Sequence, residues 1–190
     1  MSYYTKAQVT CYLGIIGAGK STYGVKIARH AFKEGLKVFT NMPDISGAYS
    51  ISLSDLMKYD ISNGVVIWDE MGIEANNRDY KSFPKHAREW FKLSRHAKCA
   101  VHVFSQALDF DITIPRITTS IYTMRKGLFL PITWLTRWRQ IRETDVQTGY
   151  PRWIWTPSRF PSRFCWRPKY YKFFNSWDMP KLPPYKMFWL

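Results

Sequence analysis

Short runs of apolar residues recur along the first two thirds of the chain, and each has the length of a buried β-strand. They are separated by stretches in which apolar side chains return at helical spacing. Strands without polar alternation, with helices between them, are typical of a parallel sheet that is buried on both faces. We therefore predict an α/β fold with a mostly parallel sheet covered by helices on both faces. The predicted strands span residues 8–13, 36–40, 65–68, 100–104 and 121–124.

Two segments between these strands have the pattern of amphipathic helices. Residues 21–33 form the first, directly after the first strand. Residues 82–98 form the second, with Ser82 as its cap and Pro84 in its first turn. A shorter segment of one or two helical turns is predicted at residues 54–59.

The last third of the chain has a different composition. Residues 134–190 carry 11 Lys and Arg against 3 Asp and Glu, whereas residues 1–133 carry 17 against 11. Alternation from Trp134 to Arg142, a turn near Gly149 and the run Trp153–Trp155 predict a β-hairpin. We predict a core formed by the first segment. The second is predicted to be a basic, aromatic C-terminal appendage made of the hairpin and an extended, proline-rich tail.

Residues 14–21 match the phosphate-loop pattern G-x-x-x-x-G-K-[ST] in full, between a predicted strand and a predicted helix. Glycines in such a loop let backbone N–H groups wrap phosphates, and the helix that follows turns the positive end of its dipole toward the anion. The lysine adds a cation for the β- and γ-phosphates, and the last hydroxyl can bind Mg²⁺. The sequence therefore predicts a P-loop NTPase that binds ATP. The predicted nucleotide-binding residues are Gly14, Gly17, Ala18, Gly19, Lys20, Ser21 and Thr22.

The strand at residues 65–68 is followed by two carboxylates, Asp69 and Glu70. An aspartate at the end of a buried strand can orient Mg²⁺, so Ser21 and Asp69 are the predicted metal ligands. A glutamate directly after it can polarise the attacking water. We therefore predict that Glu70 is the catalytic base and that Lys20 acts with it on the phosphates.

Three further residues are candidates for catalysis. Gln106 follows the strand at residues 100–104, and a polar side chain there can sense the γ-phosphate; a polar strand end that faces solvent is the alternative. Arg95 and Arg116 lie on either side of that strand and are candidates for an arginine finger that reaches a neighbouring subunit's site. Since the chain has 28 Lys and Arg, a solvated surface role stays open for both.

Net charge and cysteine usage narrow the class of protein. The formal net charge of +14 points to a polyanionic partner, with nucleic acid first and an anionic membrane surface second. The three cysteines are far apart and lack metal-ligand spacing, which favours a reducing compartment. The sequence shows neither a signal peptide nor the roughly 20 apolar residues that would cross a bilayer. We expect a cytoplasmic protein without a transmembrane segment of its own.

The combined elements resemble the zonular-occludens-toxin-like ATPases, a family of filamentous-phage assembly proteins. The resemblance covers most of the chain, but the phosphate loop is its one highly specific motif. The other matching motifs are Thr40-Asn41 after the second strand, Ile67-Trp68-Asp69-Glu70, Ser94-Arg95-His96 with Ser105-Gln106 and Pro115-Arg116, and the aromatic run at residues 172–177.

This resemblance implies a viral motor ATPase that couples ATP hydrolysis to packaging or extrusion of DNA during virion assembly. It implies ATP and Mg²⁺ as cofactors and the viral genome, expected to be single-stranded, as the partner. We also expect a homo-oligomer that lies at the inner membrane through a membrane-embedded assembly partner. The chain is expected to depart from the family in having no transmembrane helix.

Two other functions stay open from the sequence. A small nucleoside or nucleotide kinase would fit the length, but it needs an acceptor pocket and an arginine-rich lid. A nucleotide-gated adaptor that binds DNA and hydrolyses ATP poorly would fit the charge. The cations and aromatic residues that alternate at residues 159–172 suit single-stranded DNA, packing onto the core, or an interface with a membrane partner.

Overall fold

The chain folds around one sheet, which the computed structural model describes for residues 3–42, 45–70, 84–106, 116–144 and 151–173. The order of eight strands is β3-β2-β4-β5-β1-β6-β7-β8, and β9 pairs with β7 beside this path. The strands are β1 (Val9–Leu13), β2 (Lys37–Thr40), β3 (Tyr49–Ser50), β4 (Gly64–Trp68), β5 (Ala100–Ser105), β6 (Ser120–Lys126), β7 (Ile132–Thr144), β8 (Pro151–Pro157) and β9 (Arg163–Trp166).

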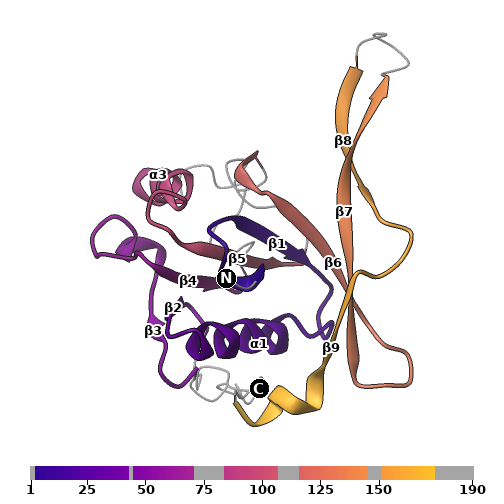
Figure 1. Ribbon diagram of the computed structural model, residues 1–190, viewed down its shortest axis with the longest axis horizontal. Coiled ribbons are helices and arrows are strands. Elements are labelled where there is room, and N and C mark those ends of the chain that lie inside the picture. The colour runs from indigo at the N-terminus through magenta and orange to yellow at the C-terminus, as the bar shows by residue number, and fades with distance from the viewer. Residues whose placement is uncertain (1–2, 43–44, 71–83, 107–115, 145–150, 174–190) are drawn as a thin grey trace, which may run out of the picture.

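Strands β1 to β6 pair in parallel with one another, and β7 pairs antiparallel with β6. Each of the five strands expected from apolar runs is present within a residue or two of its predicted bounds. The α/β class with a mostly parallel sheet is thereby confirmed. Figure 1 shows helix α1 (Lys20–Lys33) below the sheet and helix α3 (Lys85–Leu93) above it.

Two predictions about the helices were wrong in detail. Helix α3 ends at Leu93 rather than at residue 98, because the Ser94 hydroxyl bonds the Phe91 carbonyl at 2.8 Å and Lys98 takes a left-handed φ of 53°. Pro84 lies at the cap and not inside the first turn, and Ser82 falls outside the described residues. The turns expected at residues 54–59 form one 3₁₀ turn, η2 (Leu53–Asp55); two others are η1 (Tyr3–Thr5) and η3 (Arg167–Phe173).

The core forms two layers because successive side chains of a strand point to opposite faces of the sheet. In β4, Val66 and Trp68 pack with Trp90 of α3 on one face. Val65 and Ile67 pack with α1 on the other face. The burial of both faces explains why these strands are apolar without alternation.

The C-terminal segment continues the same sheet. β7 pairs with β6 from Tyr122↔Arg137 to Lys126↔Thr133, and with β8 from Trp138↔Pro157 onward. The predicted hairpin is thereby confirmed, and Figure 1 shows it extending beyond the rest of the sheet. The domain boundary at residue 133 stays a prediction, and it falls within β7. Among the described residues, no helix is both long and apolar enough to cross a membrane.

Candidate active site

The phosphate loop connects the carboxyl end of β1 to the first turn of α1. Gly17 and Gly19 take left-handed φ angles of 78° and 91°, which favour glycine. Gly14 lies so close to Met124 that an added Cβ would be 3.1 Å from its Cβ and its carbonyl oxygen. Its N–H donates to the Ser105 carbonyl at 3.0 Å, which fastens the loop to β5. The pattern of glycines is therefore required by both conformation and space.

Lys20 is buried at the start of α1, with 6% of its side chain exposed. Its ammonium donates to the carbonyl oxygen of Gly14 at 2.9 Å and lies 3.5 Å from Oε1 of Glu70. Backbone carbonyls and one carboxylate thus hold the cation inside the loop, where it is positioned to meet an anion.

Asp69 lies at the end of β4, two strands from the loop. Its Oδ2 accepts a 2.7 Å hydrogen bond from the Ser21 hydroxyl. Asn41, after β2, fixes the backbone of Asp69 by donating to its carbonyl at 2.9 Å and accepting from its N–H at 2.8 Å. Burial raises the pKa of Asp69, while the bond from Ser21 acts in the opposite direction. Asn41 belongs to a motif of the family resemblance, but this positioning role was not predicted from the sequence.

Glu70 comes directly after Asp69 in the chain and takes a left-handed φ of 51°. Its N–H donates to Oδ1 of Asp69 at 3.1 Å, and its Oε2 accepts from Nε2 of Gln106 at 3.3 Å. A non-glycine residue at positive φ often marks a functional position. Here the backbone turns the carboxylate between Lys20 and Gln106, so three predicted site residues from three elements meet.

The donors at this site fit Mg²⁺. The ion prefers oxygen ligands and keeps several waters, so one or two protein oxygens beside nucleotide phosphates suffice. The Ser21 hydroxyl and the Asp69 carboxylate supply two such oxygens side by side. In the described part of the chain, no group of three or more His, Cys, Asp or Glu forms a separate metal cluster.

Arg95 and Arg116 lie away from the loop of their own chain. Both side chains are exposed. Arg95 lies in the turn before β5, where the Ala97 carbonyl bonds the N–H of Asn63 just before β4. Arg116 precedes Thr119, whose N–H bonds the carbonyl of Val9 at the start of β1. Both therefore lie at the amino edge of the sheet, opposite to the phosphate loop.

Two residues far along the chain contact the loop and were missed as site residues. The buried Thr133 hydroxyl donates to the carbonyl of Ala18 at 2.8 Å. Arg167 places Nη1 3.5 Å from the carbonyl of Gly17. Neither residue belongs to a local motif, and more than a hundred residues separate each from the loop, so no sequence signal identified them.

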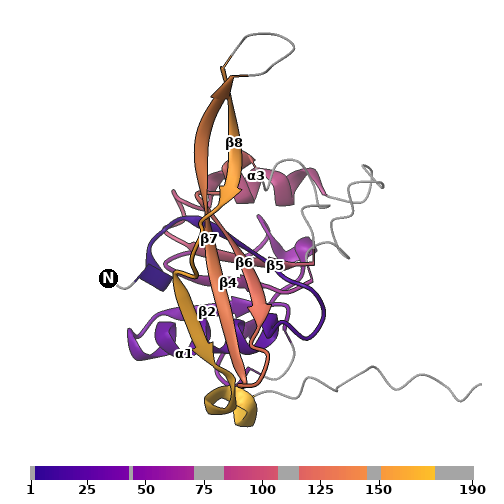
Figure 2. The same cartoon turned by 90° about the vertical axis from the view of Figure 1, so that its right-hand side faces the viewer.

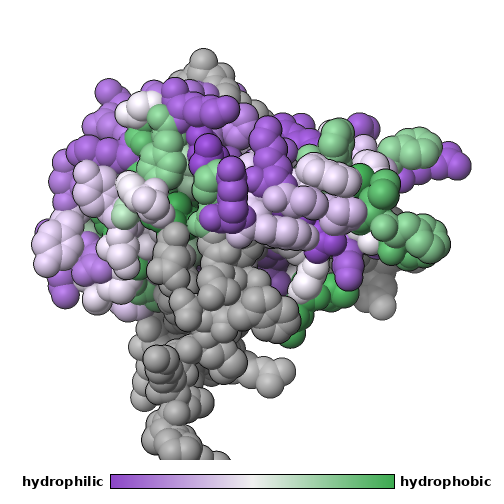
Figure 3. All heavy atoms as spheres, turned by 90° about the horizontal axis from the view of Figure 1, so that it is seen from below, coloured by the Kyte–Doolittle hydropathy of each residue, from purple (hydrophilic) through white to green (hydrophobic). Residues whose placement is uncertain are grey.

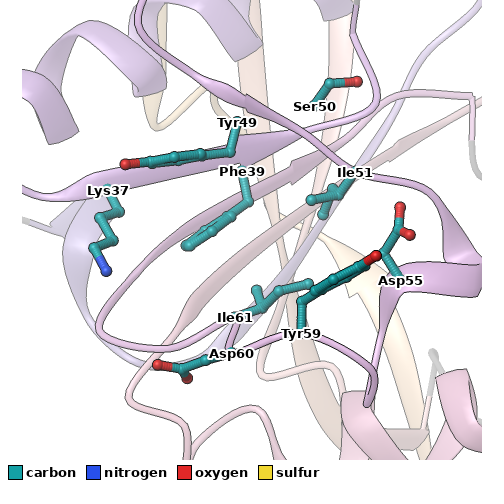
Figure 4. Close-up of a pocket in the computed structure, with 9 residues that line it drawn as sticks. All are labelled: Lys37, Phe39, Tyr49, Ser50, Ile51, Asp55, Tyr59, Asp60 and Ile61. Atoms are coloured by element: carbon teal, nitrogen blue, oxygen red, sulfur yellow. The ribbon is translucent and has the colours of Figure 1, made fainter.

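Cavities also lie elsewhere on the surface of the described residues, and two of them are considered in turn. Figure 4 shows the first, of about 350 Å³, at the β2–β3 edge, where the rings of Phe39 and Tyr49 stack beside Tyr59 and Asp55. The second, of about 580 Å³, is lined by cationic and aromatic side chains. Its residues are Tyr4, Lys26, Ser162, Arg163, Phe164, Trp166, Lys169 and Tyr170.

Comparison with known proteins gives a fold match at low sequence identity. No protein-family model matches the chain, and no curated protein matches it either. The N-terminal domain of zonular occludens toxin from Neisseria meningitidis is 17% identical, with a TM-score of 0.56 over 81% of this chain and 96% of that chain. The genome packaging NTPase B204 from Sulfolobus turreted icosahedral virus 2, in complex with AMPPCP, is 12% identical, with a TM-score of 0.50 over 77% of this chain and 96% of that one.

Identities this low establish the fold and leave the activity to be argued from the site. The chain has the α/β fold of a P-loop NTPase, similar to that of the zonular occludens toxin N-terminal domain.

Proposed function

We propose that this chain is a viral P-loop ATPase that couples ATP hydrolysis to packaging or extrusion of DNA during virion assembly. The observation that carries the ATPase part is the meeting of Lys20 with Glu70 and of Ser21 with Asp69 at one edge of the sheet. The genome packaging NTPase among the similar structures supports the viral assignment. In this proposal the protein acts as a homo-oligomer in the host cytoplasm or peripherally at the inner membrane.

Each side chain has a defined task in this reaction. ATP phosphates replace the Gly14 carbonyl and Glu70 as acceptors for the Lys20 ammonium, since a phosphate carries more negative charge. Glu70 accepts the proton of the attacking water. Gln106 orients the carboxylate of Glu70 by donating from its side-chain amide to Oε2 of that glutamate. Ser21 and Asp69 would hold Mg²⁺, which supplies positive charge against the phosphates when bound.

The DNA part of the proposal rests on the cavity of about 580 Å³ beside β9. Phe164 and Trp166 are 58% and 45% exposed there, and Lys26 and Lys169 line the same cavity. Exposed rings beside cations suit the bases and phosphates of a single strand, which are held without sequence preference. Arg163 and Lys26 also pack against rings, since the guanidinium lies 5.5 Å from the ring centre of Tyr122 and the ammonium lies 5.2 Å from that of Tyr23. Lys169 is the exposed cation of the cavity.

The kinase alternative loses support from the position of the first cavity. A kinase needs its acceptor pocket beside the transferred phosphate. The cavity in Figure 4 lies at the β2–β3 edge, and its lining contains neither the phosphate loop nor the carboxylates of the site. This cavity is therefore not placed to hold an acceptor nucleoside, whereas Glu70 beside Lys20 is placed to activate water.

ATP hydrolysis by the purified full chain, with and without single-stranded DNA, tests the enzymatic part. Lys20→Ala should abolish ATP binding. Glu70→Gln should retain ATP but hydrolyse it about 10²- to 10⁴-fold more slowly. Glu89→Gln, which alters an exposed carboxylate on α3, serves as the control and should behave as wild type. Wild-type turnover in Glu70→Gln would contradict the proposed role of Glu70 as the catalytic base.

DNA binding is tested separately by titration at increasing salt. Each phosphate contact adds nearly one unit to the slope of log affinity against log salt, so binding should weaken steeply. Lys26→Ala combined with Lys169→Ala should reduce that slope, whereas Lys58→Ala, an exposed cation elsewhere, should not. A response to salt that is flat in the wild type would contradict a DNA partner. Stronger binding to duplex than to single strands would contradict the stacking role of Phe164 and Trp166.

A further inference from the structure

The C-terminal segment packs against the phosphate loop. Pairing of β9 with β7 sets Trp166 opposite Ile132, and the N–H of Arg167 donates to the carbonyl of Pro131 at 3.0 Å. Figure 2 shows β9 running beside β7 and leading into η3, which begins at Arg167. The pairing of β7 with β9 therefore fixes the backbone position of Arg167.

The side chain of Arg167 lies along the two left-handed glycines of the loop. Its Cδ is 3.0 Å from the position that a Cβ on Gly19 would occupy. Its Nη1 is 3.5 Å from the carbonyl of Gly17, at the outer limit of a hydrogen bond. The guanidinium of Arg167 thus contacts the phosphate loop of its own chain.

The guanidinium has unused capacity for hydrogen bonding. Its Nε is buried and has no hydrogen-bond partner among the described residues. A guanidinium carries five N–H donors in a planar fork, and buried donors are normally paired. The fork matches the oxygens of a phosphate better than a single carbonyl, because two parallel bonds can form. The Nη1 end of the fork is exposed beside Gly17, so an anion bound in the loop would meet that end of the guanidinium.

We propose that Arg167 is a nucleotide ligand that donates from its guanidinium to the phosphate chain of ATP bound in the loop of its own subunit. The proposal rests on the proposed ATPase function and assigns a residue outside the phosphate loop and its acidic partner strand. It differs from the role considered for Arg95 and Arg116, because the guanidinium comes from the same subunit as the loop and not from a neighbour. A role limited to holding the loop through the Gly17 carbonyl is the competing explanation.

Three substitutions separate these roles. Arg167→Ala removes the side chain beyond Cβ, Arg167→Lys keeps a cation, and Arg167→Gln keeps a neutral donor of intermediate length. If Arg167 is a phosphate ligand, ATP affinity should be highest in the wild type and lower in Arg167→Lys. It should be lowest, and similar, in Arg167→Gln and Arg167→Ala. If Arg167 only holds the loop through the Gly17 carbonyl, the ATP affinity of Arg167→Gln should equal or exceed that of Arg167→Lys, because a carbonyl acceptor needs no cation.

The experiment measures ATP and ADP affinities of the full-length variants by calorimetry, together with the thermal midpoint of each nucleotide-free protein. Loss of one charge-assisted hydrogen bond should weaken ATP binding by on the order of tenfold to a hundredfold in Arg167→Ala. Lys33→Ala, which removes an exposed cation at the far end of α1, should bind like the wild type. The thermal midpoints should stay near the wild-type value.

Unchanged ATP affinity in Arg167→Ala, or wild-type affinity in Arg167→Gln, would overturn the proposal while leaving the ATPase assignment intact. Should Arg167→Ala fold poorly, the comparison of the Lys and Gln variants still decides the matter. Absence of ATP binding by the wild type would instead reject both the ATPase function and the role of Arg167.

Discussion

The hydroxyl of Ser21 donates to Oδ2 of Asp69 across 2.7 Å and so joins the first turn of α1 to the end of β4. The two residues are 48 positions apart in the chain. Their oxygens form the pair that would hold Mg²⁺ beside ATP, and the hydrogen bond keeps them together without the ion. Asn41 holds the backbone of Asp69 from the neighbouring strand, so the carboxylate is positioned from two sides.

Asp69→Asn should retain the contact with Ser21 but lose the negative charge that a divalent cation requires. We expect ATP turnover to fall by on the order of a hundredfold and the Mg²⁺ concentration at half-maximal rate to rise. Initial rates over a Mg²⁺ titration measure both quantities. Asp60→Asn, an exposed carboxylate in the β2–β3 cavity, is the control. A variant with the wild-type Mg²⁺ dependence would show that Asp69 does not serve the ion.

Gly19→Ala should disturb the loop more than a left-handed backbone alone would explain. A Cβ there meets the hydroxyl of Thr133 and the Cδ of Arg167, in addition to the strain at φ 91°. Gly35→Ala is a matched control, because its φ is 69° and nothing lies within 4 Å of the added Cβ. The control should lose about 1–2 kcal/mol of unfolding free energy from backbone strain. Urea unfolding should show a larger loss for Gly19→Ala, and calorimetry should show a loss of ATP binding. Equal losses in both variants would argue against the steric contact.

Arg95 and Arg116 are expected to affect hydrolysis only through a neighbouring subunit, because both lie at the sheet edge opposite to their own loop. If one is an arginine finger, its replacement by Ala should lower turnover and spare ATP binding. Mixing that variant with Glu70→Gln subunits should then restore interfaces with an intact glutamate and an intact arginine. Activity of the mixture should exceed the mean of the two parents. Activity at the mean, in a protein that stays monomeric with ATP and DNA, would reject the ring.

We expect the free energy of unfolding to fall in mild acid because of the buried His102. The ring is fully buried in β5, where its Nε2 lies 2.8 Å from the Tyr4 carbonyl and its Nδ1 lies 3.2 Å from the Tyr12 hydroxyl. Because a carbonyl can only accept, Nε2 carries the proton and Nδ1 accepts from Tyr12. Burial lowers the pKa of His102 from 6.5 to about 4, and the nearby Arg163 acts in the same direction, while the bond to Tyr4 opposes it.

Between pH 6.5 and about 4 the unfolded chain therefore binds more protons at this position than the folded chain does. The free energy of unfolding should fall by at most about 3 kcal/mol as the pH drops through this window, and it should be independent of this group above it. Urea unfolding at several pH values measures the slope. His102→Gln should flatten it, and His96→Gln, on the surface, should not. An unaltered slope in His102→Gln would place the acid sensitivity elsewhere.

Local features of the chain were predictable from the sequence because they depend on neighbouring residues. The phosphate loop occupies eight consecutive positions, so its glycines, its lysine and its serine could be identified without knowledge of the fold. The apolar runs of β4 and β5 predicted buried strands, since burial on two faces removes polar alternation. The hairpin of β7 and β8 was predictable for a similar reason, because alternation and a turn are both local.

The tertiary structure decided which distant residues meet, because that depends on the order and register of strands. It brought Gln106 to Glu70, and it placed Thr133 and Arg167 against a loop that lies more than a hundred residues earlier. It also placed Arg95 at the opposite edge of the sheet, since a residue that precedes a parallel strand lies away from the carboxyl ends. The sequence determined by itself that a phosphate-binding loop exists. Only the pairing of β7 with β6 and β9 determined that the C-terminal segment would contact it, because that contact is fixed by packing across the sheet and not by neighbours in the chain.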